Sequence, residues 1–216
     1  MKEIIIIGTG GNCVDILDTI IEINKHQNKN IYRCLGFVDD NSNLWNKSIN
    51  GVKVLGGLSE VKKYPNSLFV FGIGSSNNYI YRNELRKKID VSDERFETII
   101  HPTAFVSSLS LIGKGSIILQ NVTIASNVQL NNFVVVLPNS IVSHDCNIGE
   151  FTLITGGVCI SGSVTIGRNC YLGTNSTIKE GLNIGEKSLV GMGSVVIRDI
   201  EKNNKVVGNP ARVYDK

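Results

Sequence analysis

His144 and Asp145 stand side by side within a long apolar stretch of a chain that has only three histidines. An imidazole titrates near neutral pH, so it can take a proton from a reacting group. A neighbouring carboxylate can hold its tautomer and stabilise the imidazolium. The residue types leave two interpretations open: a general base with its orienting acid, or a solvated surface histidine.

A glycine-rich loop near the N-terminus is the second candidate site. Its sequence GTGGN, at residues 8–12, comes between an isoleucine-rich run and a helical pattern, and a loop at a helix N-terminus suits a phosphate. Cys13 replaces the third glycine of the dinucleotide fingerprint. The acidic pair Asp39 and Asp40 also comes about thirty residues later rather than about twenty. We therefore expect a phosphate-bearing ligand here rather than NAD.

Residues 1–100 alternate strand and helix patterns. The expected strands are KEIIII, RCLGFV, VKVLGG and SLFVFGIG, and helices are expected near residues 14–25 and 78–89. This alternation predicts an α/β domain with a small Rossmann-like parallel sheet. Ligands of such sheets bind beyond the carboxyl ends of the strands, where the glycine loop, the acidic pair and residues 72–76 should gather.

The rhythm of the sequence changes after residue 100. Every sixth side chain is aliphatic without a slip, at Val106, Ile112, Ile118, Ile124, Leu130, Val136, Val142, Ile148, Ile154, Ile160, Ile166, Leu172, Ile178, Ile184, Val190 and Val196. This period predicts a parallel β-helix of hexapeptide repeats over residues 101–216, with three repeats in each of about five coils. The aliphatic residues should stack inside. We expect corners with left-handed backbone at Asn127, Asn131, Asn147, Asn169, Asn183, Gly149, Gly167 and Gly185.

An unbroken β-helix offers few concave surfaces of its own. The sixteen aliphatic residues at six-residue spacing, which we call the aliphatic ladder, leave no room for a long inserted loop in any coil. A binding cleft is therefore expected between neighbouring copies of the chain. The sequence thus favours a homo-oligomer.

Composition excludes several classes of protein. The net charge is +3 and the basic residues are scattered, which argues against nucleic acid and membrane surfaces as partners. No apolar window reaches the length of a membrane span or a signal-peptide core. The five cysteines lack a C-x-x-C pair, so we expect reduced thiols in the cytoplasm, with no disulfide framework and no metal site.

The chain resembles the left-handed β-helix acyltransferases, and within them the bacterial nucleotide-sugar N-acetyltransferases. The motifs that carry the resemblance are IIIIGTGGN (4–12), FVDD (37–40), GIGSSNN (72–78), IHPTAFV (100–106), SHDCNIG (143–149) and VGNPAR (207–212). The resemblance covers essentially the whole chain. It implies left-handed coils, acetyl-CoA as acyl donor, a homotrimer, and acetylation of a nucleotide-linked 4-amino-4,6-dideoxy sugar. It leaves open both the sugar and the nucleotide, whether UDP, dTDP or GDP.

The resemblance also assigns roles to residues, with His144 as general base and Asp145 as its orienting acid. Gly162 follows His144 by one coil; its N–H should stabilise the oxyanion of the thioester, the alternative being a corner glycine. The nucleotide sugar should contact Gly10, Gly11, Asn12, Asp39, Asp40, Gly74 and Ser75, although many relatives have histidine in place of Asn12. Acetyl-CoA should contact Leu153, Gly173, Thr174, Gly191, Met192, Pro210 and Ala211, with Arg198, Lys205 or Arg212 as alternatives for its phosphates.

Two other functions stay open on the sequence. An O-acetyltransferase acting on sialic acid or another sugar would use the same scaffold with a hydroxyl acceptor. A non-catalytic sugar-nucleotide-binding module would use the β-helix for assembly alone.

Overall fold

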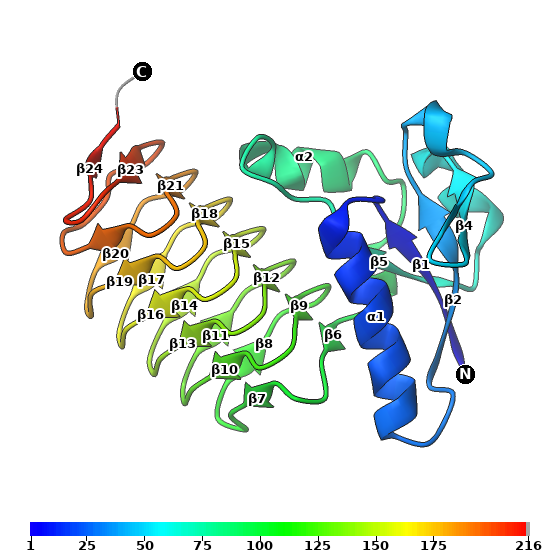
Figure 1. Ribbon diagram of the computed structural model, residues 1–216, viewed down its shortest axis with the longest axis horizontal. Coiled ribbons are helices and arrows are strands. Elements are labelled where there is room, and N and C mark those ends of the chain that lie inside the picture. Colours follow the sequence, from blue (N-terminus) through cyan, green and yellow to red (C-terminus); the bar gives the residue numbers. More distant parts are fainter. Residues whose placement is uncertain (215–216) are drawn as a thin grey trace.

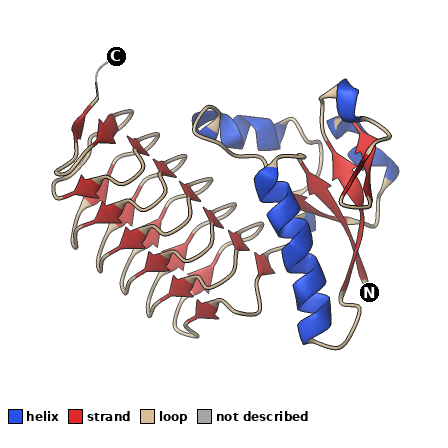
Figure 2. Ribbon diagram, viewed as in Figure 1, coloured by secondary structure: helices blue, strands red, loops and turns tan. Residues whose placement is uncertain are grey.

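The structure is a computed structural model that describes residues 1–214, and it has an N-terminal α/β domain followed by a parallel β-helix (Figure 1). The α-helices of this part of the chain all belong to the first domain, and the second is built from short strands and turns (Figure 2). The predicted fold class, a small Rossmann-like domain and a left-handed β-helix, is confirmed.

The N-terminal domain is built on a five-stranded sheet of order β3-β4-β2-β1-β5, parallel except for the β3–β4 hairpin. The strands are β1 (Lys2–Ile7), β2 (Tyr32–Val38), β3 (Ser48–Ile49), β4 (Val52–Gly56) and β5 (Leu68–Phe71). The helices are α1 (Gly11–His26) and α2 (Arg82–Lys87), with 3-10 turns η1 (Ser42–Leu44), η2 (Leu58–Lys63), η3 (Tyr79–Tyr81) and η4 (Asp93–Arg95). Both faces of β1 are covered, which explains its unbroken isoleucine run: Ile4 and Ile6 belong to one buried cluster and Ile5 and Ile7 to another.

The helix expected near residues 78–89 is instead the turn η3 followed by the short helix α2. Asn169 of the β-helix donates through Nδ2 to the carbonyl oxygens of Tyr79 and Ile80. A side chain that occupies these carbonyls replaces part of the bonding that a continuous helix would use.

The β-helix has three faces, and successive strands of the chain visit them in turn. The docking face carries the N-terminal domain and contains β6 (Ile99–Ile100), β9 (Ile117–Ile118), β12 (Val135–Val136), β15 (Leu153–Ile154), β18 (Tyr171–Leu172), β21 (Leu189–Val190), β23 (Lys205–Val207) and β24 (Arg212–Val213). The second face contains β7 (Phe105–Val106), β10 (Thr123–Ile124), β13 (Ile141–Val142), β16 (Cys159–Ile160), β19 (Thr177–Ile178) and β22 (Val195–Val196). The third face contains β8 (Leu111–Ile112), β11 (Gln129–Leu130), β14 (Asn147–Ile148), β17 (Thr165–Ile166) and β20 (Asn183–Ile184).

Three corners join these faces. We call the turn from the docking face to the second face the first corner, the turn from the second to the third face the second corner, and the turn back to the docking face the third corner. Strands of the same face pair in parallel from one coil to the next without a register shift, except that β24 pairs antiparallel with β23. The aliphatic ladder forms the core as predicted: fourteen of its members are buried, and Val106 and Ile112 pack against them.

The corners follow a rule that the sequence revealed only in part. Asn127 and Asn169 have left-handed φ angles as expected, whereas Asn131, Asn147 and Asn183 do not. Gly149, Gly167 and Gly185 are glycine for another reason, because a Cβ at each would lie 2.3–2.5 Å from backbone atoms of the next coil. Bulky side chains also occupy left-handed corners, among them Phe133 and Phe151.

The two domains share one hydrophobic cluster. It joins Ile16 and Ile20 of α1 to Ile117, Val135 and Leu153 of the docking face. α1 accordingly lies between the sheet and the β-helix (Figure 1). Among residues 1–214, no helix is long and apolar enough to cross a membrane.

Candidate active site

His144 lies on the second corner, between β13 and β14. Its Nδ1 is 2.8 Å from Oδ2 of Asp145, and its side chain is 64% exposed. The φ angle of Asp145 is 60°, a left-handed conformation that aspartate adopts more readily than most residues. The corner thus turns two adjacent residues toward each other, and the predicted pair forms.

Asn127 supports this pair from one coil earlier. Its Nδ2 donates to Oδ1 of Asp145 at 3.0 Å, so each carboxylate oxygen has its own partner. The hydrogen bond from Asn127 lowers the pKa of Asp145, and that to His144 lowers it further. This role was not among those expected from the sequence, although the coil period places Asn127 one coil before Asp145.

Gly162 lies against the imidazole of His144, one coil later at the same corner. A Cβ there would be 2.5 Å from Cε1 and 2.8 Å from Nε2 of the ring. Its φ is not left-handed, so a corner conformation does not explain this glycine. Among the described residues its N–H has no hydrogen-bond partner. The other coils place Ser126 and Glu180 at this position, so glycine occurs where the ring needs the space.

A cavity of about 520 Å³ lies at the carboxyl ends of β1, β2 and β5. Its lining includes all seven residues expected to bind the nucleotide sugar: Gly10, Gly11, Asn12, Asp39, Asp40, Gly74 and Ser75. Leu58, Asn78 and Leu85 also line it and were not anticipated. The topology rule for parallel sheets was enough to find the cavity.

The two carboxylates of the cavity have different surroundings. Asp39 accepts hydrogen bonds from Thr9 Oγ1 at 2.7 Å and from the Asn41 N–H at 2.9 Å, one on each oxygen. Asp40 accepts from the Leu58 N–H through Oδ1, and no hydrogen bond within residues 1–214 reaches its Oδ2. Asp40 therefore keeps an acceptor that a ligand can use, whereas Asp39 shapes the loop.

Most residues expected to hold acetyl-CoA lie near the first corner at the C-terminal end of the β-helix. Gly173 and Gly191 are one coil apart, and a Cβ on Gly173 would lie 2.5 Å from the Met192 nitrogen. Thr174 and Met192 are exposed, and Pro210 and Ala211 follow β23 at this end.

Leu153 does not fit the acetyl-CoA group. Its side chain is 1% exposed and packs in the cluster shared by the two domains. We therefore correct its assignment from cofactor contact to interdomain packing.

The structure places the three parts of the expected site at three separate locations on one chain. The cavity belongs to the domain on the docking face, the expected acetyl-CoA residues lie at the first corner, and His144 lies at the second corner. In a coil with three faces, the second corner is the edge opposite the docking face. One chain alone therefore does not bring the cavity and the imidazole together.

Two family descriptions match this chain. Residues 3–89 match the PglD N-terminal domain, and residues 163–198 match the hexapeptide repeat of succinyl-transferase. The N-terminal domain is thus similar to PglD N-terminal domains, and the β-helix contains the hexapeptide repeat found in succinyl-transferases. The resemblance inferred from the motifs is thereby confirmed.

Solved structures resemble this chain over its whole length. The acetyltransferase domain of PglB from Neisseria gonorrhoeae FA1090 has a TM-score of 0.85 at 23% identity, with 99% of this chain and 100% of that chain covered. PerB from Caulobacter crescentus, in complex with CoA and GDP-perosamine, has a TM-score of 0.84 at 24% identity, covering 100% and 98%. WeeI from Acinetobacter baumannii AYE has a TM-score of 0.83 at 25% identity, covering 99% and 100%. No curated protein matches by sequence.

Within residues 1–214, no group of three or more histidine, cysteine, aspartate or glutamate side chains is placed to hold a metal ion. Burial raises the pKa of the Cys13 thiol to about 12, so this cysteine beside the cavity stays protonated. The ionisable groups best placed for chemistry are thus His144 and Asp145.

Proposed function

We propose that this protein transfers the acetyl group of acetyl-CoA to the amine of a nucleotide-linked 4-amino-4,6-dideoxy sugar. The observation that carries the proposal is the His144–Asp145 pair, exposed on a corner and fitted over a glycine that leaves room for the ring. Likeness to PerB in complex with CoA and GDP-perosamine, and to the PglB domain in complex with acetyl coenzyme A, supports the choice of both substrates.

His144 acts as the general base. The sugar amine attacks the thioester carbon, and the neutral imidazole takes a proton from the amine as the N–C bond forms. The C–S bond then breaks, and the imidazolium returns the proton to the CoA thiolate, so that the products are the N-acetyl sugar and CoA. Asp145 holds the ring through Nδ1 and stabilises the imidazolium, which leaves Nε2 for the amine.

The Gly162 N–H is the proposed donor to the oxyanion. Supporting this role, Gly162 adjoins the imidazole and its N–H has no hydrogen-bond partner within residues 1–214. A donor of this kind contributes about 2.7–4 kcal/mol to the transition state.

The glycine loop at the N-terminus of α1 is the proposed phosphate site. A Cβ on Gly10 or Gly11 would meet no atom within 4 Å, so the backbone there is open to a ligand. α1 has sixteen residues, and no side chain caps its N-terminus. Its first N–H groups are therefore available to a diphosphate, and Asp40 Oδ2 is available to a ribose or base donor.

Acetyl-CoA is proposed to lie along the first corner near Gly173, Thr174, Gly191 and Met192, with its adenine end near Pro210 and Ala211. Gly173 and Gly191 have no side chain, so the narrow thiol arm of acetyl-CoA can approach the backbone there.

The assembly is proposed to be a homotrimer. The first and second corners flank the second face, whose outward side chains include Phe105, Thr123, Ile141, Thr177 and Val195. A contact of this face with a neighbour is heterologous, and it closes into a ring of three when the rotation is 120°. Such a contact can bring the acyl donor and His144 of different copies together.

An acetyl-CoA turnover assay tests the proposal. The panel should contain UDP-, dTDP- and GDP-linked 4-amino-4,6-dideoxyhexoses and sialic acid. We expect amine-dependent release of CoA with at least one nucleotide sugar. We expect its loss in His144→Ala and its retention in His26→Ala, which changes an exposed histidine at the end of α1. Normal turnover by His144→Ala would reject the base, and turnover with sialic acid alone would replace the N-acetyltransferase by an O-acetyltransferase.

A further inference from the structure

The third corner of the β-helix meets the N-terminal domain in four successive coils. Phe133, Phe151, Asn169 and Lys187 occupy the same corner position, with left-handed φ angles of 58°, 60°, 54° and 58°. Hydrogen bonds join each of them to residues 79–83 of η3 and α2. One short segment of the N-terminal domain therefore spans four coils.

Arg82 is the first residue of α2 within this segment and is fully buried. Its Nη1 donates to the carbonyl oxygens of Phe133 at 3.2 Å and Phe151 at 2.6 Å, and its Nε donates to the carbonyl of Ile73 at 2.8 Å. A Cβ on Gly74 would lie 3.1 Å from this Nε, so the glycine gives the guanidinium its space.

The charge of Arg82 has no counterion. No carboxylate of the described residues pairs with it, and its Nη2 has no hydrogen-bond partner there. Burial accordingly lowers its pKa. Burying an unpaired charge is costly, and an apolar side chain would pack the same space at lower cost. The feature that an apolar residue cannot supply is a directional link between Ile73 and two coils.

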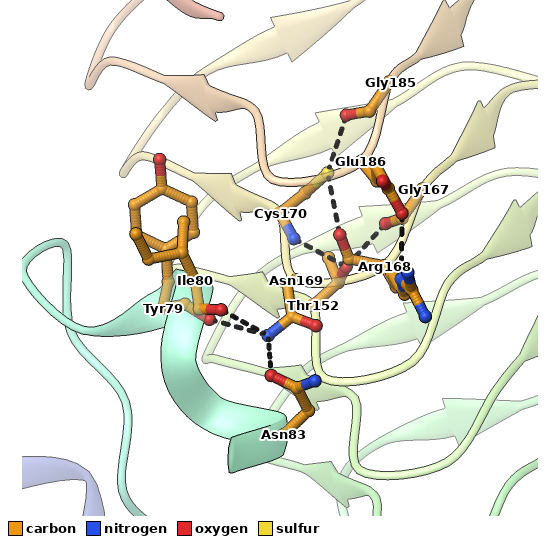
Figure 3. Close-up of polar contacts among 10 residues, drawn as sticks. All are labelled: Tyr79, Ile80, Asn83, Thr152, Gly167, Arg168, Asn169, Cys170, Gly185 and Glu186. Atoms are coloured by element: carbon orange, nitrogen blue, oxygen red, sulfur yellow. Dashed lines mark hydrogen bonds and ion pairs between the residues drawn. The ribbon is translucent and has the colours of Figure 1, made fainter. Parts of the chain in front are cut away.

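Asn169 makes a second link of the same kind (Figure 3). Its Nδ2 donates to the carbonyl oxygens of Tyr79 at 3.0 Å and Ile80 at 3.3 Å, and to Oδ1 of Asn83 at 3.4 Å. The Tyr79 hydroxyl donates to the carbonyl of Lys187 at 3.3 Å. The end of the segment that Arg82 does not reach is thus also bound to the β-helix.

The part of the cavity wall at residues 73–78 lies between these two links. Arg82 holds the carbonyl of Ile73, near the start of this wall, and Asn169 holds the carbonyl of Tyr79, directly after Asn78. We propose that Arg82 and Asn169 are positioning residues that fix this wall, and with it the bound nucleotide sugar, at one height along the β-helix.

This inference rests on the proposed function, in which the N-terminal domain holds the sugar amine and a β-helix supplies the base. Reacting atoms must approach to about 3–3.5 Å, and a misplacement of about 1 Å can cost roughly 100-fold in rate. The apolar cluster between the domains holds them together but has no directional bonds. The hydrogen bonds of Arg82 and Asn169 therefore govern the rate of transfer rather than the affinity for acetyl-CoA.

Two variants of Asn169 test the inference, and neither introduces a side chain larger than asparagine. Asn169→Gly keeps the left-handed backbone and removes the amide, whereas Asn169→Asp keeps the shape and turns an acceptor toward two carbonyl oxygens. The matched controls are Asn121→Gly and Asn121→Asp, at a first-corner asparagine with φ of 56° whose side chain bonds within the β-helix. Arg82→Lys retains the charge but cannot reach Ile73 and Phe151 together.

Steady-state kinetics of the full-length assembly give the first readout. We expect Asn169→Gly to lower kcat by about tenfold or more, and Asn169→Asp to lower it further, with the KM for acetyl-CoA within about twofold of the parent. The Asn121 controls should match the parent. Unchanged kcat in Asn169→Gly and Arg82→Lys would overturn the inference, as would an equal loss in the controls. If Arg82→Lys does not fold, the Asn169 pair decides alone.

Hydrogen exchange of the ligand-free protein gives a readout that does not depend on the reaction. We expect faster exchange of amides 73–79 in Asn169→Gly than in Asn121→Gly, with the β-helix unchanged. Equal exchange in the two variants would overturn the inference even if the enzyme is active. Faster exchange in a protein that acetylates no sugar would reject the proposed function and leave the positioning of the wall intact.

Discussion

Gly162→Ala should strongly lower kcat without unfolding the protein. The new Cβ would lie 2.5 Å from Cε1 of His144, whereas carbon atoms in contact stay about 3.5–4.0 Å apart. The ring must therefore move by about 1 Å, the difference between these values. That shift stretches the 2.8 Å bond between Nδ1 and Asp145 out of hydrogen-bonding range. We expect kcat to fall about 100-fold.

The assay is CoA release at saturating acetyl-CoA and nucleotide sugar, together with a thermal unfolding curve. The imidazole is 64% exposed and can turn into solvent, so the unfolding temperature should match that of the parent. The control is Glu180→Ala, which shortens an exposed side chain at the same corner one coil above Gly162 and should retain full activity.

Two results would refute this reasoning. A Gly162→Ala variant that keeps more than half of the parental kcat would show that the ring does not need the space above the glycine. A variant that unfolds would show that the glycine serves the coil rather than the imidazole.

Two further predictions concern the same site. Asn127→Ala should lower kcat about two- to tenfold and raise the pKa of Asp145, because its hydrogen bond lowers that pKa, as checked by steady-state kinetics and a carboxyl NMR titration. An unchanged Asp145 titration would contradict this. Gly10→Asp puts a carboxylate in the phosphate loop and should be inactive, but coexpression with His144→Ala should restore activity through mixed assemblies. Inactive mixed assemblies would place cavity and base on one chain.

Much of the fold could be predicted because its core repeats. Every aliphatic residue of the ladder faces inward, so the six-residue period alone determines the coils. The contact between His144 and Asp145 was also predictable, since the two residues are adjacent in the chain and a corner turns them toward each other. The cavity followed from a general rule on where parallel sheets bind ligands.

The contacts across the domain junction could not be predicted in this way. Arg82 and Asn169 are far apart in the sequence, and neither lies in a pattern that reports its partner. Phe133 has a left-handed φ that a bulky residue rarely adopts. Its ring stacks on that of Phe151 at a centroid distance of 4.9 Å, and this packing offsets the strain. Such a conformation depends on neighbours one coil away.

Asn127 and Gly162 form an intermediate case. Each is one coil from the residue that it serves, so the coil period predicts the contact once the register is known. The reason for Gly162 nevertheless needs the rotamer of His144, which a sequence does not contain.

The third corner presents an equivalent carbonyl in each coil, spaced by the separation of neighbouring strands, about 4.8 Å. A segment that binds such a repeating scaffold could shift by one coil and still form nearly the same hydrogen bonds. Side-chain identity removes this ambiguity. Of the four third-corner residues Phe133, Phe151, Asn169 and Lys187, only Asn169 has a side-chain amide that can donate to the carbonyl of Tyr79. A solenoid that repeats its backbone must therefore break its symmetry at single residues wherever it needs to hold another domain in one place.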